Sequence, residues 1–164
     1  MASHLKNLSD FSHTTIPNGV NFKFAIAVAE WNANITGALY QGAYETLIKH
    51  GVKEENISSF PVPGSFELPG AAEIILHKKT NVDAVICLGC VIQGDTKHFD
   101  FICEAVANGI TNVGIKYNKP VIFGVLTTND EQQALDRAGG KHGNKGDEAA
   151  ITALKMAEFS ATIS

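Results

Sequence analysis

The sequence predicts an α/β fold, a flavodoxin-like three-layer α/β/α sandwich in which helices cover both faces of a central parallel sheet. Short apolar segments alternate with longer segments of helical periodicity along the chain, and this alternation is typical of βαβ units. Strands of a parallel sheet are buried on both faces and therefore form apolar runs like these. Right-handed crossovers between such strands place the helices on both faces of the sheet.

The first half of the chain predicts two strands, each followed by a helix. Residues 22–29, "FKFAIAVA", and residues 57–62, "ISSFPV", are the expected strands. Residues 35–51 predict a helix that ends at a glycine, and residues 67–79 predict a helix in which Pro69 suits the first turn. One stripe of the first helix carries its apolar side chains, Ile35, Leu39, Ala43, Leu47 and Ile48.

The second half continues the same alternation. Residues 83–89, "DAVICLG", and residues 119–127, "KPVIFGVLT", predict strands, and residues 98–110 predict the helix between them. Two closing helices are expected over residues 129–140 and 144–161, separated by a glycine-rich bend. The sequence therefore predicts four strands and five helices.

Length and composition indicate one domain. The chain has 164 residues, 45% of them apolar and 18% charged, which suffices for an ordinary core. Because there is no internal repeat, low-complexity tract or interdomain linker, we expect a polar N-terminal arm over residues 1–21 and a single domain over residues 22–164.

Charge and hydropathy exclude two classes of partner. The formal charge is −4, and the 13 lysines and arginines are dispersed, which argues against a nucleic-acid surface. No segment reaches the roughly 18 apolar residues of a membrane helix, and the N-terminus lacks the apolar core of a signal peptide. We therefore expect a cytoplasmic protein that binds neither nucleic acid nor membrane.

The three cysteines allow two interpretations. Cys87 and Cys90 form a C-x-x-C motif, with His98 and Cys103 further along the chain, which suggests a redox dithiol or a zinc site. However, Cys87 lies inside a predicted buried strand, and a thioredoxin-type pair instead opens a helix. We therefore favour two small core residues, with Cys103 in the following helix.

The loops after the four strands are the candidate functional region. In open parallel sheets, ligands bind beyond the carboxyl ends of the strands, so these four loops should gather at one edge. Each carries glycine, aromatic or polar residues, in the segments "EWNANIT", "PVPGSFELP", "GCVIQGDTKHF" and "GVLTTND".

Each motif at this edge is ambiguous by itself. Trp31 either fills a gap at a strand end or stacks on a flat ring. The segment "GSFE", residues 64–67, is either a turn in which Ser65 caps a helix or a set of amides facing a ligand. The segment "GDT", residues 94–96, could hold a phosphate at a helix N-terminus, although three residues are a weak signal. A histidine such as His98 at a helix start is more often structural than catalytic.

The segment "RAGGKHGNKG", residues 137–146, is also open to two interpretations. It holds four glycines, two lysines and one arginine. It is either a helix C-cap and bend, or a site at which the planar donors of Arg137 bind a phosphate. Composition leaves these alternatives equal.

Four motifs in the same order as in a known family decide between these alternatives. The segments "EWNANIT", "VPGSFELP", "GCVIQGDTKHFDFI" and "PVIFGVLTTNDEQQALDRAGGKHGNKGDEAA" together resemble lumazine synthase, the penultimate enzyme of riboflavin biosynthesis. The resemblance runs from about Phe22 to the last helix, and only the arm lies outside it. Gln93 departs from the family pattern, because many members have a basic residue there.

This resemblance implies a transferase that needs no metal or organic cofactor. Lumazine synthases condense 5-amino-6-(D-ribitylamino)uracil with 3,4-dihydroxy-2-butanone 4-phosphate through an imine intermediate and phosphate elimination. Phosphate and water are released, and 6,7-dimethyl-8-ribityllumazine is formed.

The resemblance also assigns residues to the pyrimidine substrate. Trp31 is expected to stack on the pyrimidine ring. The ribityl chain and nearby polar groups are assigned to Ser65, Phe66 and Glu67. The pyrimidine pocket is expected to be lined by Cys90, Val91 and Ile92, and closed by Phe123 of the neighbouring subunit.

The resemblance assigns phosphate binding and proton transfer to five further residues. Asp95 and Thr96 match the phosphate-binding loop, with main-chain amides as donors. Arg137 matches the phosphate-binding arginine, again across a subunit boundary, and Lys145 is expected to support that arginine or the phosphate. His98 matches the acid/base residue, because the imidazole of histidine titrates near neutrality.

Assembly is implied by the same resemblance. We expect a homo-pentamer and, because no insertion separates the last two helices, a hollow shell of twelve pentamers with 60 subunits. The N-terminal arm is expected to add a strand to a neighbouring subunit's sheet, and an association with riboflavin synthase is also allowed.

Two rival functions remain open. One is a flavodoxin-like module that binds a flavin or nucleotide through Trp31 and "GDT" without catalysis. The other is an inactive container, against which the presence of His98 and Arg137 argues.

Overall fold

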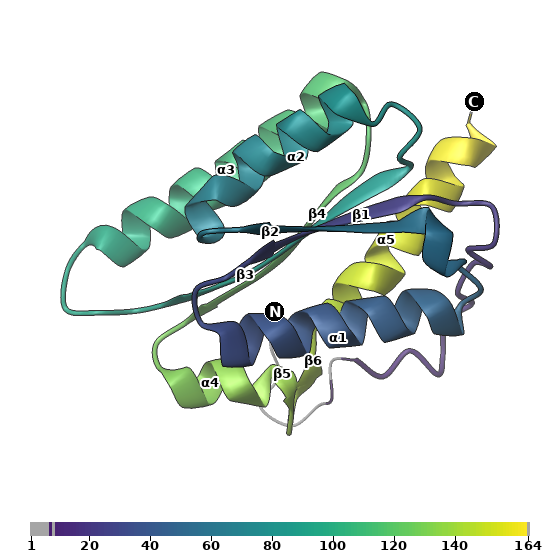
Figure 1. Ribbon diagram of the computed structural model, residues 1–164. Helices are drawn as coiled ribbons and strands as arrows, with labels where there is room; N and C mark the ends of the chain where they lie inside the picture. Colours follow the sequence, from purple (N-terminus) through teal and green to yellow (C-terminus); the bar gives the residue numbers. More distant parts are fainter. Residues whose placement is uncertain (1–6, 8, 164) are drawn as a thin grey trace.

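A sheet of four parallel strands lies at the centre of the molecule, in the order β2-β1-β3-β4 (Figure 1). The computed structural model describes residue 7 and residues 9–163. In this part of the chain, the strands of the sheet are β1 (Phe24–Ala29), β2 (Ile57–Val62), β3 (Ala84–Ile92) and β4 (Val121–Thr128). β1 and β3 are central, and β2 and β4 form the edges, so the predicted parallel sheet is confirmed.

Helices cover both faces of the sheet (Figure 1). One face is covered by α1 (Ala33–Lys49) and α5 (Lys145–Thr162), with the short α4 (Glu131–Asp136) beside α1. The other face is covered by α2 (Leu68–Lys78) and α3 (His98–Tyr117). The three-layer sandwich predicted from the sequence is therefore confirmed. Among the described residues, no helix combines the length and apolar character that a membrane span requires.

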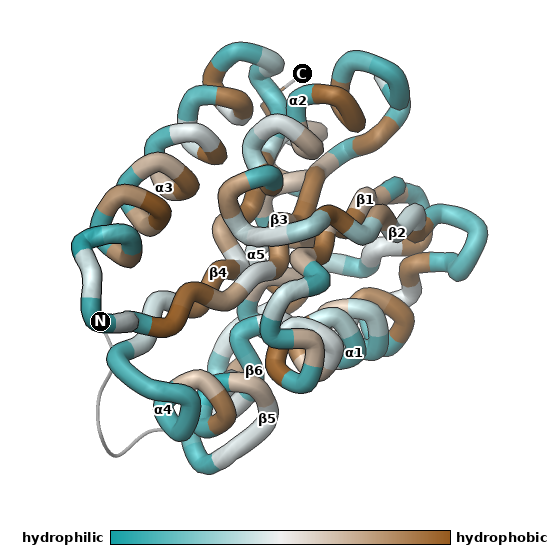
Figure 2. Tube along the Cα trace, turned by 60° about the vertical axis from the view of Figure 1, so that its left-hand side comes forward, coloured by the Kyte–Doolittle hydropathy of each residue, from teal (hydrophilic) through white to brown (hydrophobic). Residues whose placement is uncertain are grey.

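The central strands supply two apolar cores from alternate residues. Phe24 and Ile26 of β1 belong to the core under α1 and α5, whereas Ala25 and Ala27 belong to the core under α2 and α3. All four side chains are buried, because successive residues of a strand point to opposite faces and both faces are covered. Figure 2 shows apolar residues concentrated along the strands.

Two elements are longer than the sequence predicted. β3 continues past Gly89 to Ile92, because its last residues pair with the end of β4, where Ile92 lies opposite Thr128. α3 continues past residue 110 to Tyr117, because Val113 extends the buried stripe of the helix. The helix ends where Asn118 adopts a left-handed conformation with φ of 50°.

The expected helix over residues 129–140 is much shorter, and a hairpin follows it. α4 ends at Asp136, and β5 (Ala138–Gly140) then pairs with β6 (Gly143–Asn144) in an antiparallel ribbon. Gly139 and Gly143 have φ of 103° and 85°, a region that favours glycine because it has no Cβ. The predicted bend is thus an ordered turn that returns the chain to α5.

The described part of the N-terminal arm lies along its own subunit and contains no strand. The Ser9 hydroxyl accepts a hydrogen bond from the Asn144 amide, 2.8 Å away, and donates one to the Asn144 carbonyl, 3.0 Å away. The Gly19 amide donates to the His50 carbonyl at 2.7 Å. Residues 1–6 and 8 of the expected arm lie outside the described residues, as does residue 164. The division into an arm and a domain stays a prediction.

Candidate active site

The loops after the four strands meet at the carboxyl edge of the sheet, as predicted. The main-chain oxygen of Cys90, near the end of β3, accepts two hydrogen bonds from the other loops. Asn32 Nδ2 donates to it at 3.2 Å and Ser65 Oγ at 3.4 Å. The Gln93 amide donates to the Thr128 carbonyl at 2.8 Å, which attaches the fourth loop. One edge therefore holds segments that are far apart in the sequence.

Trp31 and the loop after β2 lie against each other. The Trp31 amide donates to the Pro63 carbonyl at 3.2 Å, and the side chain is 68% exposed. A Cβ placed on Gly64 would lie only 2.9 Å from Trp31 Cε3 and 3.1 Å from a Glu67 carboxylate oxygen. The absence of a side chain at Gly64 thus brings an exposed indole ring and a carboxylate close together. This arrangement can stack on a planar ligand and accept hydrogen bonds from it.

Ser65 is buried and does not cap α2. It begins the 3₁₀ helix η2 (Ser65–Glu67), and its hydroxyl is directed to β3 instead. The N-terminus of α2 has no side-chain cap, so the interpretation of Ser65 as a helix cap was wrong. Phe66 and Glu67 of the same turn are exposed.

A close approach of η2 to β3 fixes this geometry. A Cβ on Gly89 would lie 2.5 Å from Ser65 Oγ and 2.9 Å from Leu68 Cδ1. Only glycine leaves room for the loop at this distance.

The loop after β3 leads directly into α3. Residues 93–97 are exposed, and His98, also exposed, is the first residue of the helix. Thr96 Oγ1 accepts a hydrogen bond from the His98 amide at 3.3 Å. Within the described part of the chain, the amides of Asp95 and Thr96 have no acceptor. Free amides at the positive end of a 20-residue helix suit an anion such as phosphate.

The two cysteines of the C-x-x-C motif are buried strand residues, as the favoured interpretation predicted. Burial raises the pKa of the Cys87 thiol to about 12 and that of Cys90 to about 11, where the negative charge of Glu131 adds to the effect. Both thiols therefore stay protonated at neutral pH, which disfavours thiolate chemistry. Cys103 lies in α3. Among the described residues, no three His, Cys, Asp or Glu side chains gather as a metal site.

The end of β3 presents the other pocket residues. Cys90 is buried, whereas Val91 and Ile92 are half-buried at the edge. Exposure therefore increases towards the end of β3, and the apolar side chains of Val91 and Ile92 lie next to the loops.

Phe123 lies apart from this edge in the same chain. It pairs with Cys87, three residues before Leu126, the partner of Cys90. That spacing corresponds to about 10 Å along the strand. Phe123 is 36% exposed on the edge strand β4.

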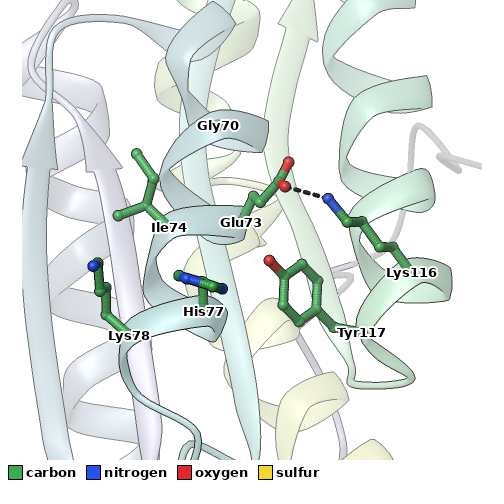
Figure 3. Close-up of a pocket in the computed structure, with 7 residues that line it drawn as sticks. All are labelled: Gly70, Glu73, Ile74, His77, Lys78, Lys116 and Tyr117. Carbon is green, nitrogen blue, oxygen red and sulfur yellow. Dashed lines mark hydrogen bonds and ion pairs between the residues drawn. The ribbon is translucent and has the colours of Figure 1, made fainter.

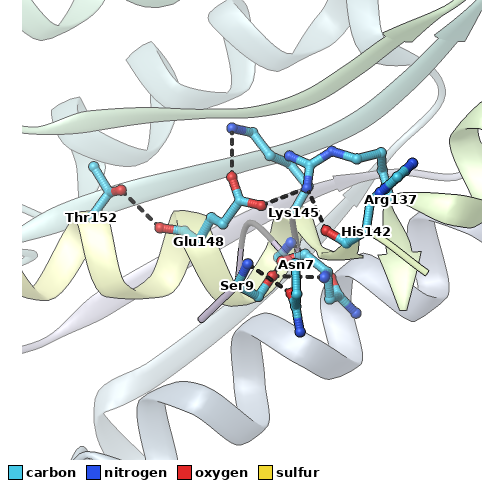
Figure 4. Close-up of polar contacts among 9 residues, drawn as sticks. Asn7, Ser9, Arg137, His142, Lys145, Glu148 and Thr152 are labelled. Carbon is cyan, nitrogen blue, oxygen red and sulfur yellow. Dashed lines mark hydrogen bonds and ion pairs between the residues drawn. The ribbon is translucent and has the colours of Figure 1, made fainter. Parts of the chain in front are cut away.

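Arg137 and Lys145 form a second group of site residues, around Glu148 (Figure 4). Arg137 Nη1 donates to Glu148 Oε1 at 2.7 Å and to the His142 carbonyl at 3.0 Å. Lys145 Nζ donates to Glu148 Oε2 at 3.3 Å. None of the described contacts of Arg137 is with the loop over residues 93–97. The structure therefore separates most of the predicted site residues into two groups. The edge group lies at the carboxyl edge of the sheet and comprises Trp31, residues 65–67, residues 90–92 and residues 95, 96 and 98. The hairpin group comprises Arg137 and Lys145, around Glu148.

Two residues of these groups were not singled out in the sequence. Asn32 joins two loops, and its position between a strand and a helix was the only signal. Glu148 lies three residues after Lys145, a spacing that brings side chains together on a helix. That spacing could have indicated the pair.

The groove between α2 and α3 is distinct from both groups (Figure 3). It has a volume of about 590 Å³ and contains an ion pair between Glu73 and Lys116. Its lining residues are Gly70, Glu73, Ile74, His77, Lys78, Lys116 and Tyr117. No residue assigned to a substrate from the sequence lines it.

Comparisons with known proteins give a consistent result. A family model described as 6,7-dimethyl-8-ribityllumazine synthase matches residues 21–161. A protein of that name from Cytophaga hutchinsonii is 64% identical over 95% of this chain and 97% of the relative. Another from Phocaeicola vulgatus is 54% identical over 97% of this chain and 94% of the relative. A third, from Parabacteroides distasonis, is 53% identical over 98% of this chain and the whole relative.

Proposed function

The chain belongs to the 6,7-dimethyl-8-ribityllumazine synthase family, and from this premise we propose that it forms 6,7-dimethyl-8-ribityllumazine. Its substrates are 5-amino-6-(D-ribitylamino)uracil and 3,4-dihydroxy-2-butanone 4-phosphate, and the reaction is the penultimate step of riboflavin biosynthesis. The observation that carries this proposal is the edge group: Asn32, next to Trp31, and Ser65, two residues before Glu67, both donate hydrogen bonds to the Cys90 carbonyl, and the loop before His98 follows the same strand.

The reaction requires two substrates to be held together and several protons to be moved. The 5-amino nitrogen attacks the ketone, and loss of water gives an imine. Phosphate leaves by elimination, and the ribitylamino nitrogen closes the ring on the new carbonyl with loss of water. Because amines and ketones condense without help, alignment of the two substrates supplies a large part of the acceleration.

The pyrimidine binds at the edge group in this proposal. The exposed indole of Trp31 stacks on the ring, and Glu67 accepts hydrogen bonds from the ligand. Ser65 is committed to the Cys90 carbonyl, so it supports the pocket through the main chain. Phe66 is exposed beside it, while Cys90, Val91 and Ile92 supply apolar and main-chain contacts.

The butanone phosphate binds beyond the start of α3. The free amides of Asp95 and Thr96 face the dianion at the helix N-terminus. His98 lies two residues after Thr96 and three after Asp95, and it transfers protons during imine formation and elimination. Gln93 contributes no positive charge, so the amides and Arg137 carry the phosphate recognition.

The site is completed by a second subunit. Phe123 and the hairpin group of Arg137 and Lys145 have no described contact with the edge group of the same chain. In a ring of subunits, these residues reach the edge group of a neighbour. We therefore propose a homo-pentamer, a shell of twelve pentamers, and a single domain over residues 22–164.

The cellular setting follows from the pathway. Both proposed substrates are polar and one carries a phosphate, which supports the proposal of a cytoplasmic location. The product is the substrate of riboflavin synthase, which is the expected protein partner.

A turnover assay tests the proposed activity. Purified protein is mixed with both substrates, and the absorbance and fluorescence of the lumazine are followed against a protein-free control. We expect formation well above the control. A rate equal to the control, from folded and assembled protein, would refute the synthase proposal and favour a binding or container role.

A further inference from the structure

The carboxylate of Glu148 is shared between two cations. One oxygen accepts from Arg137 at 2.7 Å and the other from Lys145 at 3.3 Å (Figure 4). The side chains of Arg137 and Glu148 are only 15% and 16% exposed. This partial burial makes the ion pair less screened than a surface pair.

The contacts of Arg137 leave one edge of its guanidinium open. Both hydrogens of Nη1 are engaged, one with Glu148 Oε1 and the other with the His142 carbonyl. In the part of the chain that the structure describes, Nε and Nη2 have no acceptor. These two nitrogens form a planar fork that binds phosphate through two parallel hydrogen bonds.

The hairpin and α5 hold Glu148 at a fixed distance from Arg137. The Lys145 amide donates to the Arg137 carbonyl at 2.8 Å. Asn144 caps α5 by accepting from the Gly146 amide at 2.8 Å, and its Nδ2 donates to the Ala38 carbonyl at 2.9 Å. Because the start of α5 is held from three sides, the carboxylate one turn later has little freedom.

We propose that Glu148 is a positioning residue for phosphate recognition: it orients the Arg137 guanidinium so that its Nε–Nη2 edge faces the substrate phosphate, and it holds Lys145 beside it. This inference rests on the proposed function and assigns to it a residue that touches neither substrate. Two cations and one carboxylate leave a net positive charge for the phosphate dianion.

Positioning and simple charge effects predict opposite results. If Glu148 acted only through its charge, its neutralisation would remove a repulsion and strengthen phosphate binding. If it positions Arg137, a neutral amide holds the guanidinium only by a weaker hydrogen bond and cannot also accept from Lys145, so the guanidinium is less well oriented and phosphate binding weakens. The sign of the change therefore decides between them.

The experiment compares Glu148→Gln, which keeps the shape of the side chain, with the wild-type assembly. Glu158→Gln is the matched control, because Glu158 lies exposed on the same helix. Calorimetry measures the Kd of inorganic phosphate, and steady-state kinetics measure kcat and the KM of both substrates. For Glu148→Gln we expect the phosphate Kd and the KM of the butanone phosphate to rise about tenfold, with the KM of the pyrimidine unchanged.

The second variant, Glu148→Asp, keeps the charge on a shorter stem, and its phosphate Kd should fall between those of wild type and Glu148→Gln. It also keeps the test valid if Glu148→Gln does not fold. An unchanged or lower phosphate Kd in folded Glu148→Gln would overturn the inference. A wild-type protein without turnover would instead refute the proposed function, and the phosphate titration would still test the role of Glu148.

Discussion

At the scale of the residue, Asn32 shows how a side chain without reactive chemistry can build the candidate site. Its φ of 59° and ψ of 48° lie in the left-handed region, which Asn tolerates better than most residues. Its amide group donates to the Cys90 carbonyl, and its own carbonyl accepts from the Ile35 and Thr36 amides. The residue thus turns the chain after Trp31 and attaches it to β3, at a conformational cost located where the ligand is expected.

His98 is the side chain of the edge group that we expect to transfer protons, and its exposure limits the expected effect of its loss. We predict that His98→Ala slows turnover by less than about 100-fold, because alignment of the substrates is preserved. Steady-state rates of lumazine formation measure this, with His13→Ala in the exposed arm as the control. A rate equal to that of the wild type would exclude His98 from the mechanism.

Asp147 carries a pH dependence of stability beside the hairpin group. Burial raises the pKa of its carboxyl above the usual 3.8, against the opposing hydrogen bond from Thr46, and Glu148 and Glu45 raise it further. The folded state therefore binds a proton more readily than the unfolded state. Between the ordinary and the raised pKa, stability falls as pH rises, and at neutral pH the fold holds a partly desolvated charge.

Asp147→Asn should accordingly increase the free energy of unfolding at pH 7, because the amide can still accept from Thr46 Oγ1. The gain should disappear below about pH 3.8, where both side chains are neutral. Urea unfolding at a single protein concentration measures the difference, with the exposed Glu158→Gln as the control. A variant less stable than wild type at pH 7 would show that the attraction of the α5 N-terminus for a negative charge outweighs the burial.

Residues at loop positions were predictable from the sequence, whereas residues that act through packing were not. Trp31, Glu67 and His98 follow strands, and the carboxyl ends of parallel strands must share an edge. The environment of Glu148 depends on the β5–β6 hairpin, whose geometry cannot be predicted from the periodicity of the sequence. The role of Glu148 and the roles of the other site residues stay predictions.

At the scale of the element, the end of β3 determines whether the edge group can form. In this strand Gly89 packs against Ser65, and the next residue is Cys90, whose carbonyl accepts hydrogen bonds from Asn32 and Ser65. A larger residue at position 89 would force η2 and α2 away from the sheet. The methyl group of an alanine at position 89 is therefore expected to be enough to disrupt the edge group.

Gly89→Ala should destabilise the protein by about 1–3 kcal/mol, the usual cost of overpacking, and should raise the KM of the pyrimidine. The matched control is Gly37→Ala in α1, where a Cβ would meet no atom within 4 Å and a helix should gain stability. Chemical denaturation and steady-state kinetics give the two quantities. Wild-type values for Gly89→Ala would mean that the loop tolerates a wider separation.

Periodicity predicted the bounds of some elements closely, but it missed features that depend on pairing between residues far apart in the sequence or on glycine-rich turns. β2 has the predicted bounds, and α1 and α2 differ from prediction by at most two residues at each end. β3 was predicted too short because its last residues are set by pairing with β4, in which Thr128, the partner of Ile92, lies 36 residues further along the chain. The β5–β6 hairpin was missed because its glycines also fit a simple bend.

At the scale of the whole molecule, several large apolar side chains are exposed on the surface. Trp31, Phe66, Phe101, Ile115, Phe123 and Phe159 are all exposed. Ile115 and Phe159 line one groove together with Met156 and Ile163, which are also exposed. Apolar surface of this kind marks contacts with other chains, which supports the proposed oligomer.

If the site is formed by two subunits, two inactive variants should complement each other, which a monomeric enzyme could not show. One variant carries Trp31→Ala and His98→Ala in the edge group, and the other carries Phe123→Ala and Arg137→Ala. Each homo-oligomer should have very low activity, since every site lacks one half. The single variant Arg137→Ala should mainly raise the KM of the butanone phosphate.

After the two variants are unfolded together in equal amounts and refolded, random assembly into closed rings should leave about a quarter of the sites with both halves intact. Turnover should then rise to about a quarter of the wild-type rate, whereas folded variants mixed without subunit exchange should stay inactive. No recovery from mixed oligomers, verified by sedimentation, would mean that each chain completes its own site, and the proposed contribution of Phe123 and Arg137 across the boundary would be wrong.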